Sequence, residues 1–346
     1  VGGKIAVADN VSAHFRMDLG EGIWGLDYSF LPARPGANPF DYALDSKIEI
    51  DRAYLQIDMG TWALLAGQQY LSLGIAQVFD TNATGLVMAL DYNPITVALV
   101  YATLSERASV SDEGDLDDLD GYAVNVAYAG NGFNSNVFYV KVEDGTCYDF
   151  SPWALGFNGS TKVGIVDLTG ELAFLGGDSG SGELKTDYSG TQLYLGAEAP
   201  ITDRLNLGAE FMYAKGTDDD EVQLTTLATW NTFSPMSNNT PMSTEFSALP
   251  QNNTAFDPFG VSGGVIAGTV YADFTVNELL SLGCKLGYFE PEDSGKLESA
   301  DLFAYNMWVK YQLTSNTFLS GTYMSASADG NNGEYDAFPE DKKLLV

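Results

Sequence analysis

Histidine and cysteine, the side chains on which many hydrolytic and metal sites depend, are nearly missing from this chain of 346 residues. There is one histidine, His14, and there are two cysteines, Cys147 and Cys284. A catalytic triad or a histidine–metal site would have to be built on His14, which lies within a stretch of alternating apolar and polar residues. There is also no phosphate-binding loop and no CxxC motif. We therefore expect no enzyme activity and no resident cofactor.

The two cysteines are too few for a disulfide framework. Cys147 lies in a turn-rich segment, EDGTCYDF, whereas Cys284 follows Leu280 and Leu282 on the apolar side of an expected strand. These different settings favour two free thiols, although a disulfide between them stays open at the level of the sequence.

Basic residues are scarce as well. Lys and Arg together number 16 against 47 Asp and Glu, which gives a formal net charge of −31. Such a chain cannot neutralise the phosphates of nucleic acid, so nucleic acid is excluded as a partner. It also has no basic patch for adhesion to anionic lipid headgroups. The charge suits a surface that holds divalent cations or a water-filled passage that favours cations.

Long hydrophobic runs are the third absence. No segment approaches the roughly 18–20 apolar residues of a membrane helix, and the nearest, 260–272, is short and built largely of Gly, Val and Ala. A soluble protein gives this result. A transmembrane β-barrel gives it too, because only every second residue of its strands is apolar.

What the chain does have is strict alternation. In the segment 190–216, Leu193 and Leu195 alternate with polar or small residues before a turn at 200–204, and Leu207 and Phe211 do so after it. A period of two predicts strands with one apolar and one polar face. In a barrel, these four side chains would face lipid, and the turn would lie at the periplasmic rim.

The same pattern recurs along the chain, where short turns alternate with long polar loops. About 16 strands of some 9–13 residues are visible, which is the length of a tilted membrane crossing. Such segregation of loop lengths is typical of outer-membrane barrels and not of soluble sandwiches. We predict a single all-β domain over 1–346, a transmembrane antiparallel up-and-down β-barrel of 16–18 strands. Its long extracellular loops are expected at about 31–46, 105–120, 217–262 and 327–343.

Both termini look truncated, since the chain begins inside a strand pattern and ends in what resembles the start of another. If a strand is missing at each end, 18 strands are expected in place of 16.

Charged and polar side chains fall on the strand faces opposite the apolar ones. Buried in a dry core, each charge would cost several kcal/mol unless paired, whereas inside a wide barrel it is wetted. We therefore expect these residues to line the interior; they are Arg16, Asp18, Arg52, Tyr54, Asp58, Lys141, Asp167, Glu171, Glu198, Glu210, Lys285 and Lys310.

Three oxygen-rich segments, 112–120, 218–220 and 329–334, could hold Ca²⁺. None has the ligand spacing of a calcium loop, so solvated acidic loops are the favoured interpretation.

Two segments carry a resemblance to a known family. VGGKIAVADNVSAHFRMDLG is similar to the strand, Asp-Asn turn and strand found early in Gram-negative outer-membrane porins, and IEIDRAYLQIDM followed by LLAGQQYLSLG resembles their next hairpin. The resemblance implies a homotrimer of barrels in the outer-membrane lipid, each a diffusion channel for small hydrophilic solutes. It also implies that Ser72–Thr84 is the constriction loop, with Asp80 as its acidic member and with Arg16 and Arg52 on the facing wall.

The chain departs from the family pattern in two places. Gln68 and Gln69 stand where a basic residue is common, and the C-terminal aromatic residue of such barrels is missing. The leading functional hypothesis is a water-filled, cation-favouring porin. The alternatives are a barrel with a structural role, such as a sheath for a periplasmic electron carrier or a surface-layer anchor, and a secreted β-rich adhesin.

Overall fold

A computed structural model describes residues 2–19, 48–75, 78–105, 119–144, 151–180, 185–215, 222–223, 228–229, 265–290, 292, 301–315, 317–329 and 342–345. Cys147, the loop expected at 31–46 and most of the acidic segments (112–118, 218–220 and 330–334) lie outside these residues. Within them, no helix has the length and apolar character needed to cross a membrane.

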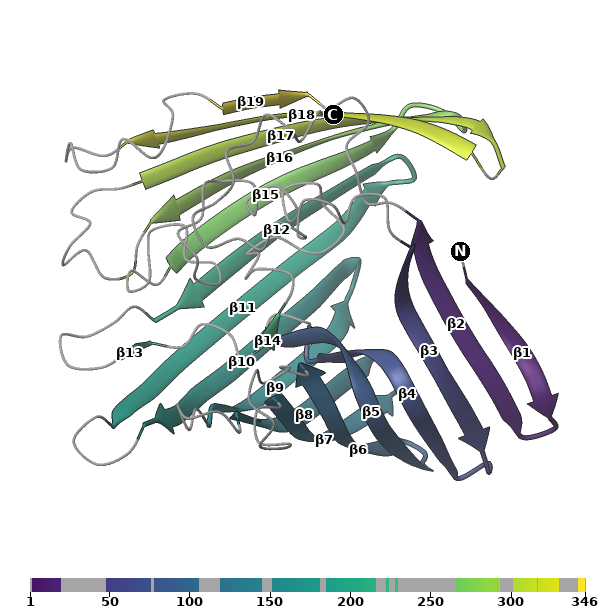
Figure 1. The fold of residues 1–346 in the computed structure, drawn as a ribbon. Helices are drawn as coiled ribbons and strands as arrows, with labels where there is room; N and C mark the ends of the chain where they lie inside the picture. The colour runs from purple at the N-terminus through teal and green to yellow at the C-terminus, as the bar shows by residue number, and fades with distance from the viewer. Residues whose placement is uncertain are drawn as a thin grey trace.

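Sixteen long strands build one sheet (Figure 1). Their length, from 7 to 17 residues, mostly exceeds the roughly five to six residues of strands in soluble proteins. They are β1 (Gly2–Ala8), β2 (Val11–Leu19), β3 (Ile48–Asp58), β4 (Trp62–Leu73), β5 (Phe79–Tyr92), β6 (Ile95–Ser105), β7 (Leu119–Gly130), β8 (Phe133–Asp144), β9 (Trp153–Val163), β10 (Val166–Ser179), β11 (Thr186–Thr202), β12 (Leu205–Ala214), β15 (Val265–Thr275), β16 (Leu280–Glu290), β17 (Asp301–Thr314) and β18 (Thr317–Asp329).

Three shorter strands complete the sheet. β19 (Lys342–Leu345) pairs with β18, while β13 (Val222–Gln223) and β14 (Ala228–Thr229) run parallel to β11 and β5. β13 and β14 lie inside the segment 217–262, which was expected to be loop throughout. Strand pairing also reaches a few residues into the loops expected at 105–120 and 327–343.

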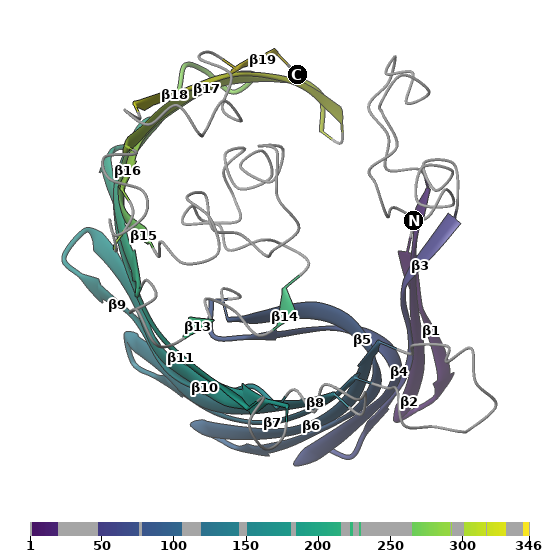
Figure 2. The ribbon, with the colours of Figure 1, turned by 60° about the vertical axis from the view of Figure 1, so that its left-hand side comes forward.

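Each long strand pairs antiparallel with the next along the chain, and β12 continues to β15. The sheet curls around a central space but is not closed, because no pairing joins β1 to β19 among the described residues (Figure 2). The predicted up-and-down architecture is confirmed.

The loop asymmetry is also present. The connections 9–10, 93–94, 131–132, 164–165 and 203–204 are two residues long and lie at one rim, whereas the connections of the opposite rim are mostly long. In outer-membrane barrels the short-turn rim is periplasmic.

Alternation assigns the two faces of the wall. In the hairpin of β11 and β12, Leu195, Leu207 and Phe211 are exposed on the outer face, while Tyr194 and Glu210 are buried on the inner face. Along the other strands the outer face is likewise covered by exposed Leu, Val, Phe and Tyr side chains. A continuous apolar outer face is what a bilayer requires.

One hairpin leaves the wall. The long-rim ends of β4 and β5 bend into the central space, where β14 pairs with β5 (Figure 2). Leu71, Leu73 and Phe79 pack there on apolar inner-face residues of β6 to β10, such as Phe138 and Val140, and form the main buried cluster of the described residues. The segment Ser72–Thr84 was expected to be a loop. Most of it is paired strand instead, because this packing keeps the hairpin extended.

The assignment of the outer and inner faces can be tested by introducing one lysine on each face in turn. Leu195→Lys places an ammonium against lipid at mid-wall, and we expect it to lower the free energy of unfolding in vesicles by about 2–4 kcal/mol. Thr169→Lys lies on the inner face, where Thr169 stands opposite Gly196 in the same strand pair, and should change stability by no more than about 0.5 kcal/mol. Equal losses in urea titrations would contradict this assignment of faces.

Candidate functional site

The tip of the inward hairpin is fixed to the wall by one carboxylate. The backbone N–H of Ile75 donates to Oε2 of Glu171 at 2.6 Å, and the side-chain amide of Asn158 donates to the same oxygen at 3.3 Å. Glu171 is only 4% exposed. Gly74 has φ +65° and no room for a side chain, since a Cβ there would collide with the Glu171 carboxylate and with Phe138. These contacts therefore fix the tip of the hairpin in one position against the wall.

The other face of the hairpin meets a cluster of charges on β2 and β3. Asp51 Oδ2 lies 3.1 Å from Nε of Arg16 and 3.5 Å from Nε of Arg52, and its Oδ1 accepts a hydrogen bond of 2.8 Å from Asn82 of β5. The Arg52 guanidinium lies over the ring of Tyr70, 5.3 Å from its centroid. These contacts hold the inward hairpin from its second side and pair both arginines with one carboxylate.

Asp51 was missed in the sequence because a period of two places it with Leu55 on the outer face. The pairing shifts between Arg16 and Met17 of β2, because a bulge in β3 places two residues, Asp51 and Arg52, opposite a single residue of β2. The signal was in the sequence: the apolar positions are Ile48 and Ile50 before Asp51, and Ala53, Leu55 and Ile57 after Arg52. That change of phase requires an extra residue in between.

The opposite wall carries a buried ion pair. The Lys285 ammonium lies 2.5 Å from Oε2 of Glu210, with their side chains 0% and 3% exposed. Tyr194 and Thr269 each donate a hydroxyl hydrogen bond of 3.0 Å to the Glu210 carboxylate, and Asn306 stands beside Lys285 in register. Because both charges are satisfied in this way, the pair adds little net charge to the interior.

Nearer the short-turn rim the inner wall is acidic. Glu198 is exposed, and its carboxylate accepts hydrogen bonds from the Asn206 amide and, at 2.8 Å, from the Tyr271 hydroxyl. Trp308 donates a hydrogen bond to Asp273 on the same face. No ammonium contacts either carboxylate within the described residues.

The remaining residues that were predicted to line the interior make separate contacts along the wall. Tyr54 stacks on His14, with ring centroids 4.7 Å apart, and Asp58 accepts a hydrogen bond from the Gly60 N–H in a short turn. Asp167 pairs with Lys162 at 2.7 Å. Lys310 lies over the ring of Phe318, 4.2 Å from its centroid. The side chains of Asp18 and Asp80 are outside the described part of the structure.

Lys141 was expected to line the interior, but this prediction is wrong, because Lys141 lies on the outer face. In register it stands between Tyr122 and Trp153 near the long-loop rim, and its ammonium lies 2.5 Å from Glu143. The inner face of β8 is apolar as well, since the inward hairpin covers Phe138. The rule that charges oppose the apolar face therefore fails on this strand.

Beyond the strands, Lys185 contacts Asp178 at 3.1 Å and Asp187 at 3.0 Å. Hydrogen bonds from its ammonium to these carboxylates raise the pKa of Lys185 above its ordinary value. The long-loop rim thus has a paired cation at this point.

No protein-family model matches the sequence, and no curated protein does. Solved structures do. OccAB4 of Acinetobacter baumannii has a TM-score of 0.57 at 11% identity, over 96% of this chain and 84% of that one. OccK10 (OpdN) of Pseudomonas aeruginosa has 0.55 at 12%, over 99% and 89%. The fold is that of a Gram-negative outer-membrane porin.

A third porin, OccK2 (OpdF) of Pseudomonas aeruginosa, was solved in complex with glucuronate and has a TM-score of 0.54 at 12% identity, over 97% of this chain and 83% of that one. These neighbours are outer-membrane channels and not enzymes. At such identities the likeness is one of fold, which confirms the predicted fold class and the family resemblance at that level.

The anchor of the hairpin can be tested at Glu171. Glu171→Ala leaves the Ile75 N–H without its acceptor, so we expect a loss of about 1–3 kcal/mol of stability and a noisier single-channel current. Glu171→Gln retains an acceptor oxygen and should stay close to the parent in both measurements. If the alanine variant has a quiet current and parental stability in urea titrations, the anchor lies elsewhere.

Proposed function

We propose that the chain is an outer-membrane porin that lets small hydrophilic solutes and ions diffuse passively through a water-filled interior. The observation that carries the proposal is the contrast between the two faces of the wall. The outer face is apolar, while charged and hydroxyl-bearing side chains of β2, β3, β11, β12 and β15 to β17 surround the inner space. An interior lined by charged and hydroxyl-bearing side chains favours hydrophilic solutes over apolar ones.

The pairing of charges supports a preference for cations. Arg16 and Arg52 share Asp51, and Lys285 is buried against Glu210. Glu198, in contrast, is exposed and has no ammonium partner among the described residues. With a net charge of −31 on the chain, the field along the path favours entering cations.

The pore lining that we propose keeps the residues predicted from the sequence except Lys141, which is on the outer face, and adds Asp51 and Asp273. Asp80 belongs to it by its position in β5, opposite Ser72 on the inward hairpin. We further propose a homotrimer, as in the porin family that the sequence resembles.

Reconstitution in planar bilayers tests the proposal. Stepwise conductance is expected, with a reversal potential in a KCl gradient that has the sign of cation preference. Insertion without conductance would instead favour a barrel with a structural role, and anion preference would overturn the assigned selectivity.

Glu198 offers a sharper test of selectivity. A unit charge in water acts on an ion at ~7 Å with about 0.6 kcal/mol, which physiological salt screens to about 0.25 kcal/mol. Because the sign is opposite for cations and anions, Glu198→Gln should reduce the cation-to-anion permeability ratio about two-fold. The matched control is Glu143→Gln, which removes a carboxylate from the outer face and should leave the ratio unchanged. Equal effects of both variants would mean that only the overall charge matters.

A further inference from the structure

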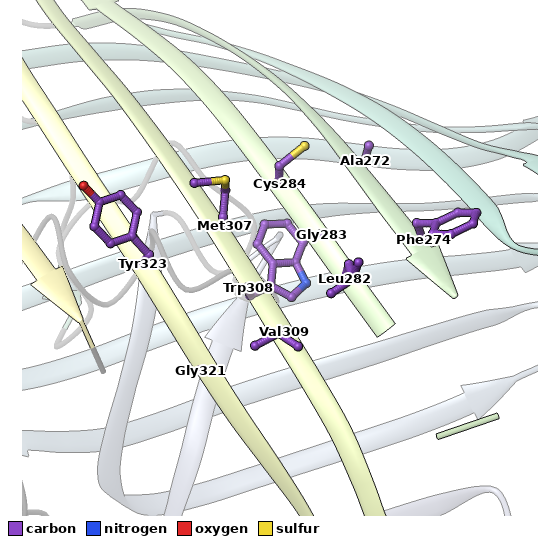
Figure 3. A pocket seen from close by; sticks show the side chains of 10 residues that line it. All are labelled: Ala272, Phe274, Leu282, Gly283, Cys284, Met307, Trp308, Val309, Gly321 and Tyr323. Atoms are coloured by element: carbon purple, nitrogen blue, oxygen red, sulfur yellow. The ribbon is translucent and has the colours of Figure 1, made fainter. Parts of the chain in front are cut away.

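The outer face of β15 to β18 has a hollow of about 570 Å³ (Figure 3). Three short residues, Ala272, Cys284 and Gly321, contribute to it from three different strands. Leu282 and Met307, both exposed, stand beside them. No charged residue lines this groove.

The groove lies in the half of the wall next to the short-turn rim. Ala272 is near the end of β15 and Cys284 near the start of β16, on either side of the short connection 276–279, and the two residues are opposite each other in register. Met307 follows opposite Cys284 on β17. At this depth an outer-membrane barrel faces the acyl chains of the periplasmic leaflet, which consists of phospholipid.

A hollow in a lipid-facing wall has to be filled, because an empty one forfeits dispersion contacts along its whole lining. Its rims continue directly into the apolar band that contacts the bilayer, since Leu282, Met307 and Phe274 belong to both. A flexible hydrocarbon chain can enter from that band and follow the curved lining without desolvating a polar group. A uniform apolar lining without charge offers nothing for a headgroup or a peptide to pair with.

We propose that this groove holds one acyl chain of a periplasmic-leaflet phospholipid in a fixed position, as a bound lipid and not as part of the freely exchanging annulus. The inference rests on the proposed outer-membrane location of the barrel. Its occupant is the chain of the lipid, and the headgroup is expected at the level of the short turns.

Trp308 reports on the groove. Its indole lies against Gly283, where a Cβ would collide with the ring, and both residues line the hollow. The Trp308 side chain is on the inner face, where it donates a hydrogen bond to Asp273, so the backbone of β16 and β17 separates the ring from the lipid. Gly283 is on the same inner face, so a lipid chain seated in the groove lies on the other side of this backbone, one sheet thickness from the ring.

The experiment uses a variant of the full chain in which Trp24, Trp62, Trp153 and Trp230 are replaced by Phe, so that only Trp308 fluoresces. It is reconstituted into vesicles of phosphatidylcholine with increasing fractions of the same lipid brominated at mid-chain. We expect Trp308 to lose most of its fluorescence already at low fractions of brominated lipid, as for a single site that exchanges slowly with the bilayer.

Ala272→Leu fills the groove and should abolish this quenching. Ala53→Leu is the matched control, since Ala53 is on the outer face of β3, far along the sheet, and should leave the quenching unchanged. Cys284→Leu is a second filling variant, with the same expected loss. Conductance is measured on every variant in parallel, so that a failed barrel is recognised separately from an empty groove.

The proposal is overturned if the channel conducts but quenching is weak, rises in proportion to the brominated fraction and is unchanged by Ala272→Leu. Loss of conductance and of insertion together would instead count against the proposed function. If a second copy of the chain covers the groove, Cys284 in a Cys147→Ser background will form a disulfide-linked dimer on oxidation and brominated lipid will not quench Trp308, which would also overturn the proposal.

Discussion

The requirement that every backbone N–H and C=O find a partner inside the wall governs this structure. In a bilayer no water can satisfy these groups, so the strands must pair with their neighbours over their full length. That pairing fixes a side-chain period of two, and the period divides each strand between lipid and interior. The apolar outer face and the charged interior are two results of the same constraint.

The inward hairpin satisfies the same constraint away from the wall. β4 and β5 remain paired with each other as they bend inward, and their released edge is partly covered by β14. The hairpin turns an apolar side to β6–β10 and its other side to Arg52 and Asp51. The hairpin thereby adds Asn82 and Tyr70 to a cluster of three charges that the pairing of β2 with β3 already brings together.

The fold could be predicted from the sequence because alternation and loop length are local properties. The site could be predicted only in part, because it depends on one departure from alternation and on the packing of the inward hairpin. Asp51 reaches the interior through a bulge, whereas Lys141 follows the alternation but lies on the outer face, because the inward hairpin covers an apolar inner face that includes Phe138. Glu171 was placed correctly on the inner face, yet its contact with Ile75, 96 residues away along the chain, follows from tertiary packing alone.

The packing of the hairpin on β6–β10 also makes the interior eccentric. Where the hairpin covers those strands, solutes cannot touch their inner face, since Phe138, Val140 and Ala173 are fully buried. The charged side chains of the inner face that the hairpin leaves uncovered include Arg16 and Arg52 on β2 and β3 and Glu198 on β11. In the proposed channel, a solute therefore meets charged side chains on the arc of the wall that the hairpin leaves uncovered.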